Sequence, residues 1–192
     1  MTDLEILTVD NAQHSEVLRS KSRAVQKVTP KLAAFAEQML ETMRKADGVG
    51  LAAPQVGVLQ RFFVAELPED EENNHPRETY ILFNPEIVKG KGEQVGYEGC
   101  LSIPGYIGEV ARQEEITVKG LNERGKPVRL KVEGYLARVF QHEIDHLDGI
   151  LFTDKLTDPD TLQPVTVGQE EAFELQAEAE LRASAEMKTA IP

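Results

Sequence analysis

The chain is poor in cysteine, in positive charge and in long apolar runs, and each shortage excludes a class of protein. Cys100 is the single cysteine among 192 residues, so no disulfide can form within the chain. The 33 acidic residues outnumber the 21 lysines and arginines, and the net charge of −12 argues against a general binder of nucleic acid or anionic membranes. No apolar run approaches the roughly 20 residues that a membrane-spanning helix requires.

The beginning of the sequence also lacks the basic stretch and the apolar core of a secretion signal, so we expect a cytoplasmic protein. A chain of this length suits one domain with a sizeable core. We assign residues 1–166 to a single catalytic domain and residues 167–192 to an acidic, helical carboxyl-terminal tail. The tail is rich in glutamate and carries only a thin apolar stripe.

Histidine is scarce as well, yet two of the four histidines fall in the segment Gln141-His142-Glu143-Ile144-Asp145-His146, an H-E-x-x-H motif. Residues four apart share one face of a helix, so His142 and His146 are placed to direct two imidazoles at one metal ion. Glu143 projects about 100° away round the helix, where a general base for a metal-activated water belongs. The alternative is two ordinary surface histidines on an amphipathic helix.

A catalytic metal needs a third protein ligand and one open position. Phe152 stands where one class of zinc proteases has a third histidine, and it cannot ligate. Glu170 and Glu171 lie in a glutamate-rich stretch typical of a solvated helix. A thiolate is a strong ligand for zinc or ferrous iron, so Cys100 is the best third ligand. A Cys–His nucleophile pair is the competing use of this cysteine, although it leaves the second histidine and the glutamate without a role.

The segment Gly48 to Gly57 fits the pattern G-x-G-x-x-A of a dinucleotide-binding turn. It follows an expected helix rather than a strand, however, and Pro54 interrupts the helix that should come next. We interpret the segment instead as bare backbone that a ligand can approach closely. Gln55 is its only polar side chain and is placed to donate a hydrogen bond there. A plain glycine-rich turn is the alternative.

The order of the predicted elements indicates an α+β fold with antiparallel strands around a central H-E-x-x-H helix, a further N-terminal helix and a C-terminal helix. The N-terminal helix is expected to begin at Pro30, capped by Thr29, and to end before Gly48; the motif helix should follow Gly134 and end at a left-handed Gly149. Strands are expected at 4–9, 61–67, 79–88 and 94–102, a hairpin at 115–121 and 128–132, and a loop or single helical turn at 11–22.

Three segments of the chain match, in order, the motifs G-x-G-L-A-A-x-Q, E-G-C-L-S and Q-H-E-x-D-H-L-x-G. They are Gly48 to Gln55, Glu98 to Ser102 and Gln141 to Gly149. Together they resemble one family, peptide deformylase, from about Ile6 to Leu156. Three matches in the same order are specific, where any one of them alone is not.

The resemblance implies a metal-dependent hydrolase that removes the formyl group from the N-terminal formyl-methionine of newly synthesised polypeptides and releases formate. The metal is expected to be Fe2+ in the most active form, with Zn2+ or Ni2+ able to substitute, held by Cys100, His142 and His146. Water activated by the metal would attack the formyl carbon. Glu143 would take its proton and deliver it to the leaving amine.

The same resemblance assigns roles to groups around the metal. The Leu101 backbone N–H and the Gln55 amide are expected to stabilise the oxyanion. Gly50 is expected to pair with the backbone of the substrate, which would bind as an added strand. Glu98 is expected to pair with Arg112 and so hold the strand that carries the cysteine.

Helical spacing and the resemblance together predict a pocket for the methionine side chain. Val139, Arg138 and Tyr135 share the His142 face of the motif helix, and Val49 is expected to join them. We expect Arg138 to place its aliphatic stem in the pocket and its charge in solvent. The alternative for each is simple packing in the core.

The implied substrate is a formylated nascent peptide, so we expect a bacterial-type protein that acts near ribosomes. The acidic tail argues against docking on ribosomal RNA, and no direct nucleic-acid or membrane partner is expected. Two other classes remain open. A zinc endopeptidase would cleave internal peptide bonds, and a structural metal-binding module would require a fourth protein ligand.

Overall fold

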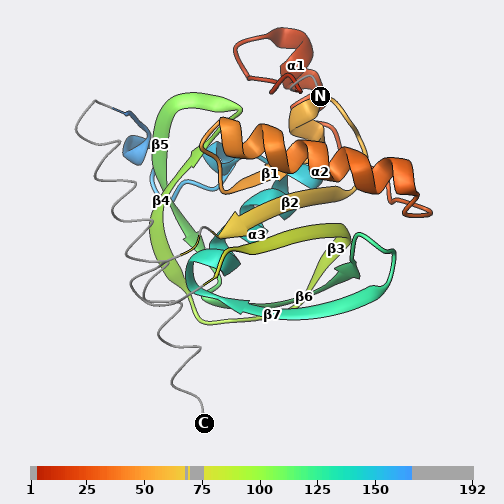
Figure 1. The fold of residues 1–192 in the computed structure, drawn as a ribbon. Coiled ribbons are helices and arrows are strands. Elements are labelled where there is room, and N and C mark those ends of the chain that lie inside the picture. Colours follow the sequence, from red (N-terminus) through yellow and green to blue (C-terminus); the bar gives the residue numbers. More distant parts are fainter. Residues whose placement is uncertain (1–3, 68, 70–75, 166–192) are drawn as a thin grey trace.

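A computed structural model describes residues 4–67, 69 and 76–165, which form three α-helices and two antiparallel sheets (Figure 1). The helices are α1 Ala12–Leu18, α2 Pro30–Lys45 and α3 Gly134–Leu147. The strands are β1 Gly50–Ala52, β2 Phe62–Leu67, β3 Glu78–Lys91, β4 Gln94–Cys100, β5 Ile103–Arg112, β6 Glu115–Leu121, β7 Pro127–Glu133 and β8 Gln163–Pro164. Single-turn 3-10 helices are η1 Ala53–Val56, η2 Phe152–Asp154 and η3 Pro159–Thr161.

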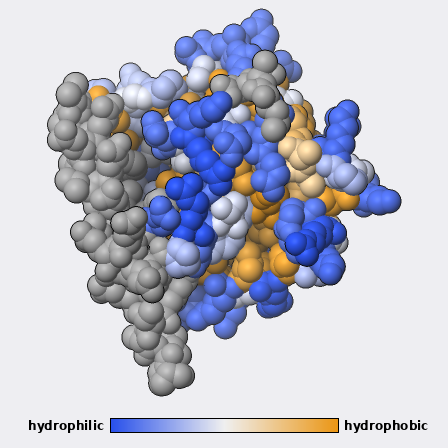
Figure 2. All heavy atoms as spheres, viewed as in Figure 1, coloured by the Kyte–Doolittle hydropathy of each residue, from blue (hydrophilic) through white to orange (hydrophobic). Residues whose placement is uncertain are grey.

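The larger sheet has the strand order β1-β2-β3-β6-β7 and lies between α2 and α3 (Figure 1). Side chains alternate across β2, so Phe62 and Val64 join the core cluster of α2, whereas Phe63 and Ala65 join that of α3. Hydrophobic side chains show at the surface between α2 and the sheet, among hydrophilic ones (Figure 2). Apolar packing thus fixes α2 against one face of the sheet and α3 against the other.

The smaller sheet has the order β4-β5-β8, and its first two strands form a hairpin. The register runs from Gln94 opposite Arg112 to Cys100 opposite Ile103, with an irregularity between Gly99 and Cys100. Leu101 and its neighbour Ser102 therefore form the turn. Cys100 stands at the tip of this hairpin, and β4 and β5 bring it to α3.

The predicted helix ends agree with the structure. The Thr29 side chain accepts a hydrogen bond from the Leu32 N–H, and Pro30 is the first residue of α2. Beyond α3, Gly149 has φ +75°, the left-handed conformation expected after a helix. The predicted α+β class and the central motif helix are confirmed. The C-terminal helix lies outside the described residues, and the division at residue 166 remains a prediction.

The structure departs from the local predictions in three places. Residues 4–9 are not a strand: the Leu7 and Val9 N–H groups donate to the carbonyls of Gln55 and Ser102, which attaches this segment to two of the motifs. Residues 12–18 are helical because the Asn11 side chain caps them. The strand β5 was not expected at all. Within the described residues, no helix has the length and apolar character needed to cross a membrane.

Candidate metal centre and active site

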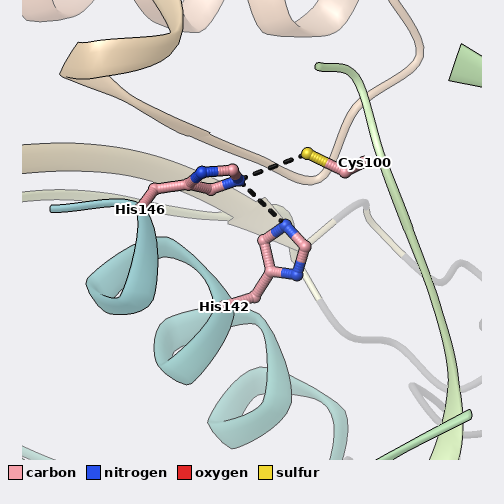
Figure 3. Close-up of side chains that lie close together, drawn as sticks. All are labelled: Cys100, His142 and His146. Carbon is pink, nitrogen blue, oxygen red and sulfur yellow. Dashed lines mark hydrogen bonds between the residues drawn. The ribbon is translucent and has the colours of Figure 1, made fainter. Parts of the chain in front are cut away.

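Three potential ligands converge between α3 and the tip of the β4–β5 hairpin (Figure 3). His142 and His146 project from consecutive turns of α3, and their Nε2 atoms are 3.2 Å apart. The Cys100 Sγ lies 3.2 Å from the Nε2 of His146. All three ligand atoms lie within 4.8 Å of one another. One sulfur and two imidazole nitrogens at this spacing suit a tetrahedral divalent metal that keeps one position open.

The orientation of the first imidazole is set by a buried carboxylate. His142 Nδ1 is 2.9 Å from Glu98 Oε2, so the ring donates there and turns Nε2 toward the centre. Glu98 also accepts from Arg112 Nε and Nη2, both at 2.8 Å, which is the expected pairing. The third nitrogen of Arg112 donates to Asp145 on α3. This network joins the hairpin to the helix directly behind the candidate metal ligands.

Burial and hydrogen bonding give Glu98 and His146 the charges that a cation site needs. Burial would raise the pKa of Glu98, but hydrogen bonds from Arg112 and His142 outweigh it and lower the pKa, so the carboxylate stays ionised. Burial lowers the pKa of His146 well below its usual value and keeps that ring neutral. Burial also tends to lower the pKa of His142, but its hydrogen bonds to Cys100 and Glu98 outweigh this effect and raise the pKa well above the usual value. A metal ion would take the place of that proton.

Glu143 follows His142 on α3 and lines the same cavity as two of the candidate ligands, and its side chain is buried. One of its oxygens, Oε2, has no hydrogen-bond partner among the described residues. Burial raises its pKa to about 7. A carboxyl with that pKa can both accept and release a proton near neutral pH. Gly50 makes room for it, because a Cβ added at Gly50 would lie 2.8 Å from the Glu143 Cδ and nearer still to Oε1.

Gln55 points its amide nitrogen at the ligand cluster. Its Oε1 accepts the Ala52 N–H at 2.7 Å, so its Nε2 faces the other way. Nε2 is 3.2 Å from Ser102 Oγ and 3.6 Å from Cys100 Sγ. Ser102 is completely buried, and no role was predicted for it, although it belongs to the E-G-C-L-S motif. The two ends of the Gln55 amide are therefore fixed, and the donor end lies beside the sulfur.

A cavity of about 410 Å³ opens in front of these groups. Its lining includes all the residues predicted for the substrate and oxyanion sites together with two of the ligands and the candidate base. They are Val49, Gly50, Gln55, Cys100, Leu101, Tyr135, Arg138, Val139, His142 and Glu143. His146 lies behind the cavity and is fully enclosed, with 1% of its surface exposed.

Arg138 differs from its predicted arrangement. Its side chain is only 4% exposed, so the guanidinium is not in solvent. It lies against the β4–β5 hairpin, where it reaches Glu98 at 3.2 Å and backbone carbonyls of both strands. Helical spacing correctly placed this residue on the His142 face. Helical spacing alone does not predict that backbone carbonyls of the distant β4–β5 hairpin accept hydrogen bonds from the guanidinium.

The competing ligands can be placed only in part. Phe152 stacks on His142 with ring centroids 6.3 Å apart, so it packs on a ligand instead of contributing one. Glu170 and Glu171 lie outside the described residues. The contact between Cys100 and His146 is that of a Cys–His pair. His142 places a second imidazole at the same point, and a thiol with two imidazoles is the composition of a metal site.

The chain is similar to proteins of one family throughout this region. A family model described as polypeptide deformylase matches residues 4–161. A peptide deformylase from Symbiobacterium thermophilum is 51% identical over 162 residues, covering 84% of this chain and 71% of its own. One from Thermomicrobium roseum is 49% identical over 158 residues, covering 82% and 90%.

Solved structures give the same result. The crystal structure of peptide deformylase from Thermotoga maritima superimposes with a TM-score of 0.74 at 40% identity, covering 82% of this chain and all of that one. A peptide deformylase from Synechococcus elongatus in complex with actinonin has a TM-score of 0.71 at 34% identity, covering 94% and 85%. The α+β fold therefore matches that of these solved structures.

Proposed function

The chain belongs to the polypeptide deformylase family, and on this premise we propose that it removes the formyl group from N-formyl-methionyl polypeptides and releases formate. The observation that carries the proposal is the convergence of Cys100, His142 and His146 beside a buried carboxyl, at the end of an open cavity. Its substrates would be nascent peptides. The acidic tail gives no reason to expect docking on ribosomal RNA.

We propose that Cys100, His142 and His146 hold one divalent ion, Fe2+ in the active form, with Zn2+ or Ni2+ able to replace it. Thiolate and imidazole are suitable donors for all three ions. The bound ion supplies a Lewis acid, which polarises the formyl carbonyl and makes water nucleophilic at neutral pH. Glu98 supports this role by fixing which nitrogen of His142 faces the ion.

Glu143 is the proposed general base. It lines the same cavity as Cys100 and His142, and its pKa of about 7 suits proton transfer from the attacking water. The proton is then delivered to the amine that leaves. Burial keeps bulk water from the carboxyl, and Gly50 leaves the space into which its oxygen projects.

The oxyanion that develops on the formyl oxygen needs donors that are already in place. Gln55 Nε2 is the first proposed donor, because Ala52 and Ser102 fix the direction of its amide. The second is the backbone N–H of Leu101, which follows Cys100 in the hairpin turn.

The edge of β1 that no described strand pairs with is the proposed binding site for the peptide backbone. The Val49 carbonyl accepts the Glu66 N–H, so the next pair along, Gly50 and Ala65, is not hydrogen bonded within the ladder. The N–H and C=O of Gly50 consequently point away from β2. Ala52 lies two residues further along the strand, so its N–H points the same way as that of Gly50, and it donates to Gln55. An extended peptide can therefore pair with Gly50 as an added strand.

Tyr135, Val139, Val49 and the stem of Arg138 are the proposed walls for the methionine side chain. They line the cavity on the side of α3 that carries His142. Because a similar protein is known in complex with actinonin, we also propose that this cavity binds actinonin. Protection of the protein against thermal unfolding by actinonin, lost when the cavity is altered at Val139, measures that binding.

The test is anaerobic metal analysis together with a formate-release assay on formyl-Met-Ala, with unformylated casein as the comparison substrate. One equivalent of metal and formate release from the dipeptide alone are expected. Cleavage of casein would identify an endopeptidase. A stoichiometric metal with neither activity would identify a structural metal-binding module.

A further inference from the structure

Arg138 is a buried cation that the proposed chemistry does not use. It lies on α3 one turn before His142, with 4% of its side chain exposed. A buried charge is costly unless it is paired and hydrogen bonded, so its partners should account for its position.

The guanidinium joins α3 to both strands of the hairpin. Nη1 lies 3.1 Å from the Val110 carbonyl, 3.3 Å from the Gly96 carbonyl and 3.2 Å from Glu98 Oε1. Nη2 lies 3.2 Å from Gln94 Oε1. Gly96 and Val110 face each other in the β4–β5 register, so one side chain contacts the hairpin across its width. A planar guanidinium with several donors can satisfy such a set, whereas a single ammonium cannot.

Glu98 is held at both of its oxygens by residues of α3. Arg138 reaches Oε1, and His142, one turn further along the helix, reaches Oε2 at 2.9 Å. Arg112 approaches the same carboxylate from β5 and continues to Asp145. Arg112 thus fixes the carboxylate itself. Arg138 fixes the distance and register between the helix and the strand that leads to the cysteine.

We propose that Arg138 is a positioning residue for the metal centre. It holds Glu98, and through it the His142 imidazole, and it holds β4, which carries Cys100, at the correct distance from α3. The consequence is tighter binding of the divalent ion. This inference rests on the proposed metal site and assigns Arg138 a role beyond lining the cavity.

Gly96 offers an independent way to disturb the same contacts. A Cβ added there would lie 2.8 Å from Arg138 Nη2 and 3.2 Å from its Cζ, so the guanidinium would have to leave the strand. Gly96→Ala therefore displaces the group without changing α3. Arg138→Met removes the group while keeping an unbranched apolar stem in the cavity wall. Arg138→Lys keeps the charge but loses the fork of donors.

The experiment measures the dissociation constant of Co2+ by chelator competition and records the Co2+ absorption spectrum. It compares the three variants with wild type and with Arg129→Met, a matched change of an exposed arginine on β7. Loss of a group that orients a metal ligand typically costs 10–100-fold in affinity. We expect weakening in about that range for Arg138→Met and Gly96→Ala, a smaller loss for Arg138→Lys, an altered spectrum in all three, and wild-type behaviour for Arg129→Met.

Each outcome decides one question. Absence of Co2+ binding in wild type would refute the proposed metal site itself. If wild type binds Co2+, and folded Arg138→Met and Gly96→Ala bind it within twofold of wild type with an unchanged spectrum, only the positioning role is refuted. A raised KM for formyl-Met-Ala at unchanged metal affinity would make Arg138 only a wall of the cavity. If Arg138→Met does not fold, Gly96→Ala and Arg138→Lys decide by the same criteria.

Discussion

Gly50→Ala should slow the reaction by displacing the general base. The added Cβ would lie 2.8 Å from Glu143 Cδ, 3.0 Å from Cγ and nearer still to Oε1. Gly50 has no positive φ, so alanine fits the backbone and the strain falls on the carboxyl. Restoring normal contact requires a shift of about 1 Å, and a misplacement of that size can cost about 100-fold in rate. The barrier would rise by about 2.7 kcal/mol.

The assay is formate release from formyl-Met-Ala, with metal content and melting temperature measured on the same samples. Metal content should not change. Glu143→Ala supplies the control background, because it removes both the Cγ and the carboxyl that the new methyl group would meet. Adding Gly50→Ala to Glu143→Ala should therefore cost only a few-fold more. A full 100-fold loss on both backgrounds would mean that Gly50 acts on the substrate instead, and unchanged kinetics in the single variant would refute the steric argument.

Three further predictions test the surrounding groups. Glu143→Gln should retain metal while formate release falls by about 10²–10⁴-fold, since a general base contributes on that order; loss of metal with an intact fold would make Glu143 a ligand. Cys100→Ala should lose metal and activity together, because the two remaining imidazoles hold a divalent ion poorly. A variant that keeps its metal would support the hypothesis that Cys100 is a nucleophile. The buried Glu66 carboxylate accepts hydrogen bonds from Arg44, Arg77 and a threonine. The Arg44 hydrogen bond is the main reason that the pKa of Glu66 is lowered. The ionised Glu66 therefore contributes stability above about pH 4.5, and this contribution declines as the pH falls. Glu66→Gln should therefore be less stable at neutral pH and lose less stability on acidification, as urea titrations across this range would show; parallel pH profiles would contradict this.

The motif helix could be predicted because its information is local. The spacing of His142 and His146 and the glycine beyond the helix end specify one face and one terminus without reference to the rest of the chain. The strand β5 could not be predicted from local pattern. It contains Pro104, Gly105 and Gly108, residues that normally signal turns, and its strand partners are supplied by β4 and by the distant β8.

Long-range packing also explains the error at Arg138. Its position on α3 followed from the helical period, but the direction of its charge depends on carbonyls and a carboxylate some 28–44 residues earlier in the chain. The direction of the Gln55 amide depends only in part on such packing, because Ala52, three residues away, fixes one end and the distant Ser102 fixes the other. Sequence patterns identified the candidate reacting groups, whereas the groups that orient them became visible only in three dimensions.

The location of Cys100 at a hairpin tip has a mechanical consequence. With a metal in place, coordination to α3 would close residues 100–142 into a loop, as a covalent cross-link would. A chain with one cysteine cannot obtain such a link by oxidation. Pulling the hairpin tip away from the helix would then require breaking a metal–sulfur bond, so a chelator should speed amide hydrogen exchange in β4 and β5 well before it affects β2 and β3.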